Sequence, residues 1–571
     1  MPKISRSANN LLTFSLLFIL FFTSCVSGQL GQKSSTEYRN GMVVSAHPQA
    51  SEVGLAILKK GGNAIDAAVA VQFALAVVYP NAGNIGGGGF LVYRDAKGQS
   101  AALDFREKAP GKASRDMYLD AEGRAIADKS LYGHLAAGVP GSVDGMVKAH
   151  VRFGKLPWAD VVQPAVDLAR NGFRLTEMQA SELNGQQEAF RAFNAGNEYL
   201  QSREAFKAGD LVRQEDLAGT LALIRDHGRA GFYEGPVAGH IRAEMETDGG
   251  LISLDDLKNY QAVWRDPVIG DYKGYKVITM PPPSSGGIAL MQLLNSVAPY
   301  PLSRWGHHSD STIQVIVEAE RRVYADRATH LGDPDYFRVP QTWLLKPEYS
   351  LARMKDFNWD RATPSAEISG GQAAPAESAE TTHFSIVDRE GNAASVTTTL
   401  NGSYGSKVFV DGAGFLLNNE MDDFSVKPGT PNMYGLVGGE ANSIQPGKRM
   451  LSSMTPTILE KDGDLFMVVG TPGGSTIITS VFQTILNVLE FGKSMQAAVA
   501  APRFHHQWLP DVVMFEKDAV DSTAKARLES KGYKLQPRSG TSGRVDAILK
   551  TKWGYYQGGA DPRGDDTALG W

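Results

Sequence analysis

The sequence predicts a layered α/β fold, and three observations support that prediction. Ala- and Val-rich runs with helical spacing occur early, at 51–58 and 64–78. Strand-like runs dominate after Thr381, and helical spacing returns at 477–489. Helices on either side of a block of strands are consistent with layers of helix and sheet that share a core.

The two early runs predict buried helices. The second run ends at Tyr79-Pro80, because proline cannot continue a helix. Four glycines at 86–89 then lead into a strand-like segment at 90–93. This run invites comparison with a phosphate-binding loop, but it lacks the Lys-Ser/Thr pair of that loop and has no preceding strand. Close backbone packing is the better interpretation, and no nucleotide is predicted.

Further helices are predicted along the chain, with irregular connections between the central ones. Apolar residues at helical spacing place them at 142–153, 158–171, 286–298, 309–326, 477–489 and 495–501.

The segment from Ser365 to Glu380 is rich in Ala, Ser, Gly, Pro and Glu and is typical of a disordered stretch. It is followed at 384–400 by two apolar, β-branched runs joined by a charged turn with Gly391-Asn392. This pattern predicts a β-hairpin.

Thr381 lies at the boundary between these two segments. Taken alone, it is typical of an ordinary threonine at the start of a strand. If the bond between Glu380 and Thr381 breaks, however, Thr381 carries both a hydroxyl and a free α-amine, whose reference pKa is about 7.7 to 8.0. A nucleophile and its general base then lie in one residue.

Many short motifs occur in a fixed order around this position. After Thr381-Thr382-His383 and the hairpin they are 400–405, 414–425, 427–429, 434–439, 451–457 and 470–475; before it they are 61–68, 86–89, 104–107, 138–142 and 281–287. In this order they resemble the γ-glutamyltranspeptidase family, over about residues 38–571. Each motif is weak evidence alone, but their ordered agreement is not a chance event.

The resemblance implies a fold and a domain organisation that periodicity alone does not establish. It implies the four-layer αββα sandwich of N-terminal nucleophile hydrolases. Cleavage before Thr381 would give a large subunit, 28–380, and a small subunit, 381–571, that together form one catalytic domain.

The resemblance also implies the reacting groups. Thr381 would attack the γ-carbonyl of a γ-glutamyl amide, and in the precursor it would attack the carbonyl of Glu380. Thr399 would hold the nucleophile, although alone it is one of three strand threonines. Gly473 and Gly474 lack side chains, so their N–H groups can approach a developing oxyanion; out of context the pair is typical of a turn.

Three residues are expected to bind the substrate α-carboxylate. Arg106 can pair with it bidentately, and Ser452 and Ser453 can donate hydrogen bonds to it. Without the family context, a lone Arg is typical of a surface ion pair and Ser-Ser of a loop.

Acidic and amide groups are expected to bind the substrate α-ammonium. Glu420 and Asp423 can accept hydrogen bonds from it, helped by Asn401, although their spacing also fits an exposed helical face. Glu420 stands where the family has Gln or Glu. Tyr434 belongs to a stretch that resembles the family's lid loop.

The implied function is a self-processing γ-glutamyltransferase and glutathione hydrolase that uses water, amino acids or dipeptides as acceptors. One alternative is a related amidohydrolase acting on γ-polyglutamate or an antibiotic side chain. Another is a non-catalytic, lipid-anchored scaffold, which should have lost the nucleophile or the glycine pair. The resemblance implies no cofactor.

Composition and charge exclude other classes. The chain has 571 residues, 42% hydrophobic and 21% charged, and can bury a large core. Its formal net charge of -5 and the lack of a basic stripe give no reason to expect nucleic acid.

The first 27 residues predict an export signal. Lys3 and Arg6 precede an apolar run at 11–22 that is shorter than a typical membrane-spanning helix. The single cysteine, Cys25, ends either a lipobox, with lipid attached to it, or an ordinary signal near a cleavage site. Both alternatives place the protein outside the cytoplasm. It would be periplasmic in a Gram-negative cell or secreted, and it would be anchored to a membrane if Cys25 is lipidated.

The histidines and the remaining acidic pair in the sequence do not predict a further catalytic or metal site. His383 is assigned to structure, because the Thr381 amine already supplies a base. Neither His505-His506 nor the pair Asp333 and Asp335 has further ligands at a recognised spacing, so no metal is predicted.

Overall fold

Two seven-stranded sheets occupy the centre of the fold. The computed structural model describes residues 37–571 except 127, 195–204, 370–380 and 434. In spatial order, the first sheet contains β1 (Glu37–Tyr38), β20 (Tyr556–Gly559), β19 (Asp546–Lys550), β15 (Asp464–Gly470), β14 (Thr457–Lys461), β9 (Tyr275–Thr279) and β8 (Val268–Tyr272). The second contains β21 (Thr567–Gly570), β2 (Met42–Ser45), β10 (Thr382–Val387), β11 (Ala393–Thr399), β3 (Gly88–Arg94), β4 (Ser100–Asp104) and β7 (Val263–Arg265).

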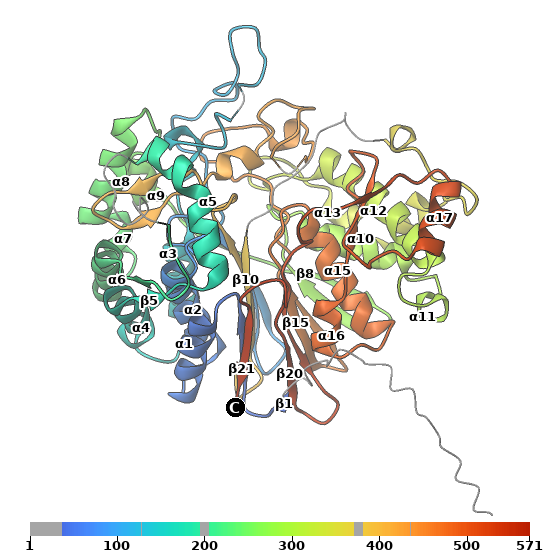
Figure 1. The fold of residues 1–571 in the computed structure, drawn as a ribbon, viewed down its shortest axis with the longest axis horizontal. Helices are drawn as coiled ribbons and strands as arrows, with labels where there is room; N and C mark the ends of the chain where they lie inside the picture. The colour runs from blue at the N-terminus through green and yellow to red at the C-terminus, as the bar shows by residue number, and fades with distance from the viewer. Residues whose placement is uncertain (1–36, 127, 195–204, 370–380, 434) are drawn as a thin grey trace, which may run out of the picture. The chain divides into compact units, whose positions relative to one another are not determined.

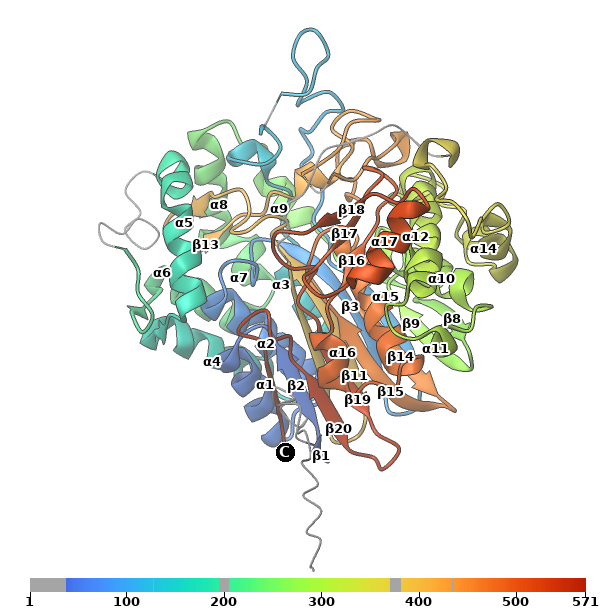
Figure 2. The ribbon, with the colours of Figure 1, turned by 45° about the vertical axis from the view of Figure 1, so that its right-hand side comes forward.

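Helices cover the outer face of each sheet (Figure 1). The second sheet is covered by α1 (Pro48–Lys59), α2 (Ala64–Val78), α3 (Ser142–Phe153), α4 (Trp158–Asn171), α5 (Glu177–Phe193), α6 (Glu215–His227), α7 (Ala230–Tyr233), α8 (Gly235–Thr247) and α9 (Leu254–Asn259). The first is covered by α10 (Gly286–Val297), α11 (Leu302–Trp305), α12 (Asp310–His330), α13 (Gln341–Leu344), α14 (Pro347–Arg353), α15 (Thr476–Leu489), α16 (Met495–Ala500) and α17 (Ser522–Ser530) (Figure 2).

Alternating side chains divide the core into three layers. In β2, Val43 packs toward the helices, while Met42 and Val44 lie in the core between the sheets. In β15, Met467 and Val469 face their helices and Val468 faces the other sheet. Because successive strand side chains point to opposite faces, both faces of both sheets are apolar, and the predicted four-layer αββα sandwich is confirmed.

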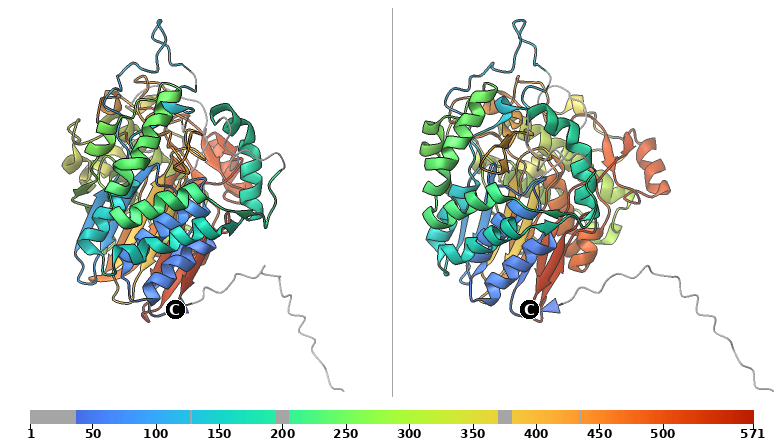
Figure 3. Two further views of the ribbon diagram at one scale, coloured as in Figure 1. Left: turned by 90° about the vertical axis from the view of Figure 1, so that its left-hand side faces the viewer. Right: turned by 60° about the vertical axis from the view of Figure 1, so that its left-hand side comes forward.

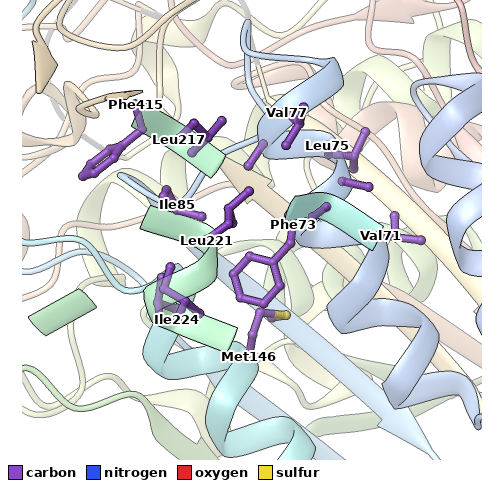
Figure 4. Close-up of a cluster of buried hydrophobic side chains, with 14 of the residues drawn as sticks. Val71, Phe73, Leu75, Val77, Ile85, Met146, Leu217, Leu221, Ile224 and Phe415 are labelled. Atoms are coloured by element: carbon purple, nitrogen blue, oxygen red, sulfur yellow. The ribbon is translucent and has the colours of Figure 1, made fainter. Parts of the chain in front are cut away.

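The helical core shows how the early runs are buried. All fifteen residues of α2 are buried, and Val71, Phe73 and Val77 lie among side chains of α3 and α6 (Figure 4). Asn63 caps α2, since its side chain accepts hydrogen bonds from the N–H groups of Ile65 and Asp66.

Most predicted elements are confirmed with small shifts at their ends. The helix expected at 51–58 begins earlier, at Pro48, because proline is favoured in the first helical turn and His47 caps it. The helix expected at 309–326 continues to His330. The predicted hairpin is formed by β10 and β11, with Gly391 at φ +89° in its turn.

The expected irregular connection between 171 and 286 is wrong, because it contains the five helices α5–α9. Their apolar stripes are narrow: in α5 only Gln179, Ala180, Leu183 and Phe190 are buried. A helix with so few buried positions gives a weak periodic signal.

The predicted disordered stretch is partly wrong. Ser365 begins a short 3-10 helix, is buried, and its N–H donates to Asp511 Oδ2 at 2.9 Å. Residues 370–380 of that stretch, with Glu380, lie outside the described residues, as do the export signal and Cys25. No helix in the described part of the chain is long and apolar enough to cross a bilayer.

The structure confirms that the glycine run at 86–89 allows close backbone packing. A Cβ on Gly87 would lie 2.0 Å from the carbonyl oxygen of Thr399, and one on Gly89 would lie 2.3 Å from that of Thr397. Only glycine lets the chain entering β3 approach β11 this closely.

Both halves of the chain contribute to both sheets. β10 and β11 pair with β2 and β3 at the centre of the second sheet, and β14 pairs with β9 in the first. The C-terminal strand β21 pairs with β2 and lies beside α1 (Figure 3). A break before Thr381 would therefore leave two pieces that share a continuous core.

Candidate functional site

Thr381 lies directly before β10 and opposite the end of β11. The register pairs Thr382 with Thr398, so Thr381 meets Thr399, and their hydroxyl oxygens are 3.3 Å apart. The backbone N–H of Asn401 donates to Thr399 Oγ1 at 2.7 Å. Thr399 thus holds the Thr381 hydroxyl at the end of the sheet, as the family resemblance implies.

The two threonines open onto a pocket with about 270 Å³ of space. Among the described residues, every predicted site residue except Gly473 lines it. The lining is Arg106, Thr381, Thr399, Asn401, Glu420, Asp423, Leu436, Ser452, Ser453, Met454, Gly474 and Ile477.

Arg106 is buried among three carboxyl groups. It follows β4, and its Nη1 is 2.6 Å from Glu420 Oε2 and 3.6 Å from Glu107 Oε2. Its Nη2 pairs with Asp423. The structure therefore joins Arg106, expected to bind a carboxylate, to the two acids expected to bind an ammonium.

Burial and mutual repulsion shift the pKa values of these groups. Burial raises the pKa of Glu420 well above its usual range and also raises that of Asp423, although Arg106 opposes both shifts. Burial raises the pKa of Glu107 to about 8. Burial opposes the charge of Arg106, but its three acidic neighbours outweigh this and raise its pKa. With one guanidinium among three carboxyl groups, carboxyl oxygens are left that can accept hydrogen bonds from a bound ammonium.

Glu107 makes the stability of the fold depend on pH. Its pKa of about 8 in the folded protein exceeds the unfolded value near 4.3, so its contribution to stability is fully present below about pH 4.3 and is lost as pH rises through 8. We expect Glu107→Gln to lose less stability than the parent between pH 5 and pH 8. Urea midpoints at both pH values measure this, and equal losses would contradict it.

Ser452 and Ser453 form another part of the pocket lining. The N–H of Ser452 donates to the Pro283 carbonyl at 3.0 Å, and the Ser452 carbonyl accepts from Ser285 N–H at 2.7 Å. Ser453 Oγ accepts from Arg327 Nη2 at 3.1 Å. Both hydroxyls thus sit on a backbone fixed to the segment that leads into α10.

Gly473 and Gly474 form the turn that leads into α15. Their φ values are +135° and +54°, and their carbonyls accept hydrogen bonds from Thr476 and Ile477 N–H. A Cβ on Gly473 would lie 2.6 Å from Thr476 Oγ1. The turn brings Gly474 to the pocket that contains Thr381, where an N–H group can stabilise an oxyanion.

Gly473→Ala should lower kcat about 100-fold or more, because the strained φ and the crowded Cβ displace the neighbouring N–H donors. The rate of hydrolysis of a γ-glutamyl anilide, normalised to the amount of protein cleaved before Thr381, measures the loss of kcat. Gly492→Ala is the matched control, since Gly492 also has a positive φ but nothing lies within 4 Å of its Cβ position. Equal kcat values for the two variants would contradict an oxyanion role.

Asn401 and the segment after Asp423 close another side of the pocket. Asn401 Nδ2 donates to the Asn419 carbonyl at 3.0 Å, and Asn432 Nδ2 donates to Asp423 Oδ1 at 3.0 Å. Leu436 lines the pocket. Tyr434 lies outside the described residues.

His383 packs between the sheets, which agrees with its assignment to structure. Its Nδ1 is 2.9 Å from Thr397 Oγ1 and its Nε2 is 3.1 Å from Ser385 Oγ. Burial lowers its pKa to about 3, which keeps it neutral.

His505 and His506, the other histidines considered in the sequence, have protein partners. His505 contacts Thr479 and Gln507 through its two ring nitrogens, each at 2.9 Å. Among the described residues, no three His, Cys, Asp or Glu side chains are grouped to hold a metal ion.

Sequence reasoning missed Arg327. This residue of α12 is 4% exposed and donates to Ser285 Oγ at 2.9 Å as well as to Ser453. No motif marks it, because an Arg on a helix is ordinarily exposed. Leu436, Met454 and Ile477, which add apolar surface to the pocket, were also missed.

Comparison with known proteins assigns the chain to a family. A family model described as Gamma-glutamyltranspeptidase matches residues 50–571. The chain belongs to the γ-glutamyltranspeptidase family. Over 536 residues it is 46% identical to the "Glutathione hydrolase proenzyme" of Escherichia coli (strain K12). The alignment covers 93% of this chain and 92% of that relative.

Solved structures agree with this membership. The chain is similar to the cephalosporin acylase from Bacillus halodurans, with a TM-score of 0.84 and 26% identity over 97% of this chain and 99% of that one. It is also similar to the γ-glutamyltranspeptidase of Helicobacter pylori, with a TM-score of 0.57 and 43% identity over 60% of this chain and 97% of that one. The γ-glutamyltranspeptidase family membership and the αββα fold are thus established together.

Proposed function

We propose that Thr381, released by cleavage before it, transfers γ-glutamyl groups through an ester on its own hydroxyl. The chain is a γ-glutamyltransferase and glutathione hydrolase. One observation carries the proposed mechanism: a single pocket combines Thr381 and Gly474 with a cation, carboxyl groups and two serines. These are the groups that a γ-glutamyl amide requires at its carbonyl, its carboxylate and its ammonium.

The donor would enter by exchanging partners in an existing ion pair. Arg106 pairs with Asp423 and Glu420 in the structure. The α-carbon of a γ-glutamyl group carries a carboxylate and an ammonium. Its carboxylate can pair with Arg106, Ser452 and Ser453, while its ammonium pairs with the acids. Charges stay balanced throughout, so insertion avoids leaving a buried charge unpaired.

The reaction then proceeds as two acyl transfers. The α-amine of Thr381 takes the proton from Oγ, which bonds to the γ-carbonyl carbon while the carbonyl oxygen gains negative charge near the glycine pair. The carbon–nitrogen bond breaks, and the amine proton passes to the leaving nitrogen. Water or an acceptor amine attacks the ester by the same steps in reverse, and its proton returns to Thr381 Oγ.

The same hydroxyl would mature the chain. Thr381 Oγ attacks the carbonyl carbon of Glu380, the peptide nitrogen leaves as the new α-amine, and water opens the resulting ester. The "proenzyme" designation of the Escherichia coli relative supports processing. The products would be 28–380 and 381–571, and the sheets that both pieces share would keep them together as a heterodimer.

A related acylase remains the second candidate. The fold similarity to a cephalosporin acylase favours it. The pocket argues against a large neutral side chain, because its carboxyl groups and Arg106 suit a free amino-acid end. A non-catalytic scaffold predicts an uncut chain that turns over no donor.

We also propose that the protein is exported. The charged start and apolar run within residues 1–27 support removal of this segment. The mass of the large subunit from native cells tests the proposal and shows whether Cys25 carries lipid. A retained N-terminus on active protein would contradict export by cleavage.

Trapping the ester tests the proposed reaction. Cleaved protein is mixed with glutathione or a γ-glutamyl anilide, quenched in acid and analysed by mass. We expect one glutamyl group on the 381–571 piece, at Thr381. A cephalosporin side-chain amide, used as the matched donor, should give no such adduct. Labelling by that amide alone would support the acylase instead.

A further inference from the structure

Arg327 contacts Ser453 of the Thr381 pocket without lining that pocket itself. It lies in the last turn of α12 and is buried. Its Nη2 donates to Ser453 Oγ at 3.1 Å, and its Nε donates to Ser285 Oγ at 2.9 Å. The reaction proposed above does not use this residue.

Arg327 is a buried cation whose hydrogen-bond partners are hydroxyl groups. The other buried arginines in the described part of the chain each form an ion pair with a carboxyl group: Arg94, Arg106, Arg321, Arg322, Arg449 and Arg503. Arg327 forms no ion pair with a described residue. A guanidinium stays protonated in proteins, and burying a charge without a counter-ion costs free energy. An anion bound nearby would offset part of that cost.

The charge of Arg327 is less compensated than that of Arg106. Burial lowers the pKa of Arg327, and the positive charge of Arg106 acts in the same direction, against Tyr324 and Asp423. Burial also opposes the charge of Arg106, but its three acidic neighbours outweigh burial and raise its pKa. A carboxylate that enters the pocket therefore meets one cation already shared by three carboxyl groups, and a second cation with no such partner among the described residues.

Arg327 also orients the serines of the pocket. A hydroxyl has one hydrogen to donate and two acceptor sites. Because Arg327 Nη2 occupies an acceptor site of Ser453 Oγ, the Ser453 hydrogen points elsewhere, and this side chain lines the pocket. Ser285 Oγ accepts from Arg327 and donates to the Ser452 carbonyl at 2.6 Å, which fixes the backbone of the neighbouring serine.

We propose that Arg327 is a positioning residue for donor recognition. It turns the Ser453 hydroxyl toward the α-carboxylate of the γ-glutamyl group, and this carboxylate supplies the negative charge that the buried guanidinium lacks. The inference rests on the proposed function, since it concerns how the same donor is bound. Arg327 acts through Ser453 and through its charge, so a ligand with a neutral carboxamide in place of the α-carboxylate should lose most of this contribution.

Two ligands that differ at this one group test the proposal. L-Glutamate and its α-carboxamide are used as inhibitors that compete with a γ-glutamyl anilide, in the parent and in Arg327→Met. The inhibition constant of glutamate should rise about 10-fold, whereas that of the carboxamide should stay the same. A substitution that only distorts the pocket would raise both constants by the same factor, and that result would overturn the proposal.

A conservative variant and a matched control complete the experiment. Arg327→Lys keeps the charge and should retain most of the preference for glutamate. Loss of that preference in the lysine variant would overturn the proposal even if Arg327→Met gives no cleaved protein. Arg322→Met is the control, because Arg322 is buried on the same helix but pairs with Glu318 at 2.6 Å. It should leave the ratio of the two inhibition constants unchanged.

Stability gives a second measurement. Arg327→Met removes a charge that has no carboxylate partner among the described residues, so the urea midpoint should stay the same or rise. Arg322→Met breaks a buried ion pair and should lower it. Equal falls in the two variants would assign Arg327 to folding and overturn the proposal. Absence of anilide turnover by the parent would instead contradict the proposed function, so the two failures are distinguishable.

Discussion

Thr381→Ala should abolish both cleavage and turnover. The variant lacks the hydroxyl that lies 3.3 Å from Thr399 Oγ1, so neither the Glu380 carbonyl nor a donor can be attacked. We expect a single uncut chain and a loss of activity of at least about 10⁴-fold. Intact mass of the purified protein, expressed without residues 1–27, measures the first effect, and anilide hydrolysis measures the second.

The adjacent residue provides the control. Thr382 is fully buried and its Oγ1 has no hydrogen-bond partner in the described structure, so Thr382→Val keeps the shape and should leave cleavage intact. Two chains split between Glu380 and Thr381 in this variant and in the parent, but not in Thr381→Ala, would establish the nucleophile. An uncut but active parent would overturn the mechanism and favour another catalytic group.

Arg106→Gln should have the largest effect on donor binding. The change removes the cation shared by Glu107, Glu420 and Asp423, and leaves buried acids without their partner. We expect a destabilisation of about 3–5 kcal/mol, the range measured when one partner of a buried pair is removed. We also expect kcat/KM for the donor to fall more than about 100-fold. Urea unfolding and steady-state kinetics measure these effects.

Arg94→Gln separates binding from stability. Arg94 is also buried and pairs with Glu460 at 2.7 Å, but it does not line the pocket. This variant should lose comparable stability and keep the donor kcat/KM of the parent. If the two variants lose activity in parallel, Arg106 contributes only to folding, and the donor carboxylate must bind elsewhere.

Local patterns predicted much of the fold because their causes are local. The run at 64–78 is apolar throughout and ends before a proline, and it forms α2 with the expected bounds. The hairpin after Thr381 was predicted from its β-branched residues and its Gly391-Asn392 turn. The helices between 171 and 286 were missed, because a narrow buried stripe such as that of α5 resembles a polar loop in sequence.

The sequence by itself determined the family, the hairpin after Thr381 and the residue types of the site, because ordered motifs can be recognised without coordinates. Tertiary structure decided which charges meet. Arg106 contacts Asp423, 317 positions away, and Arg327 contacts Ser453, 126 positions away. Such contacts depend on how strands from both halves pair and how helices pack on them, and no local spacing encodes that arrangement.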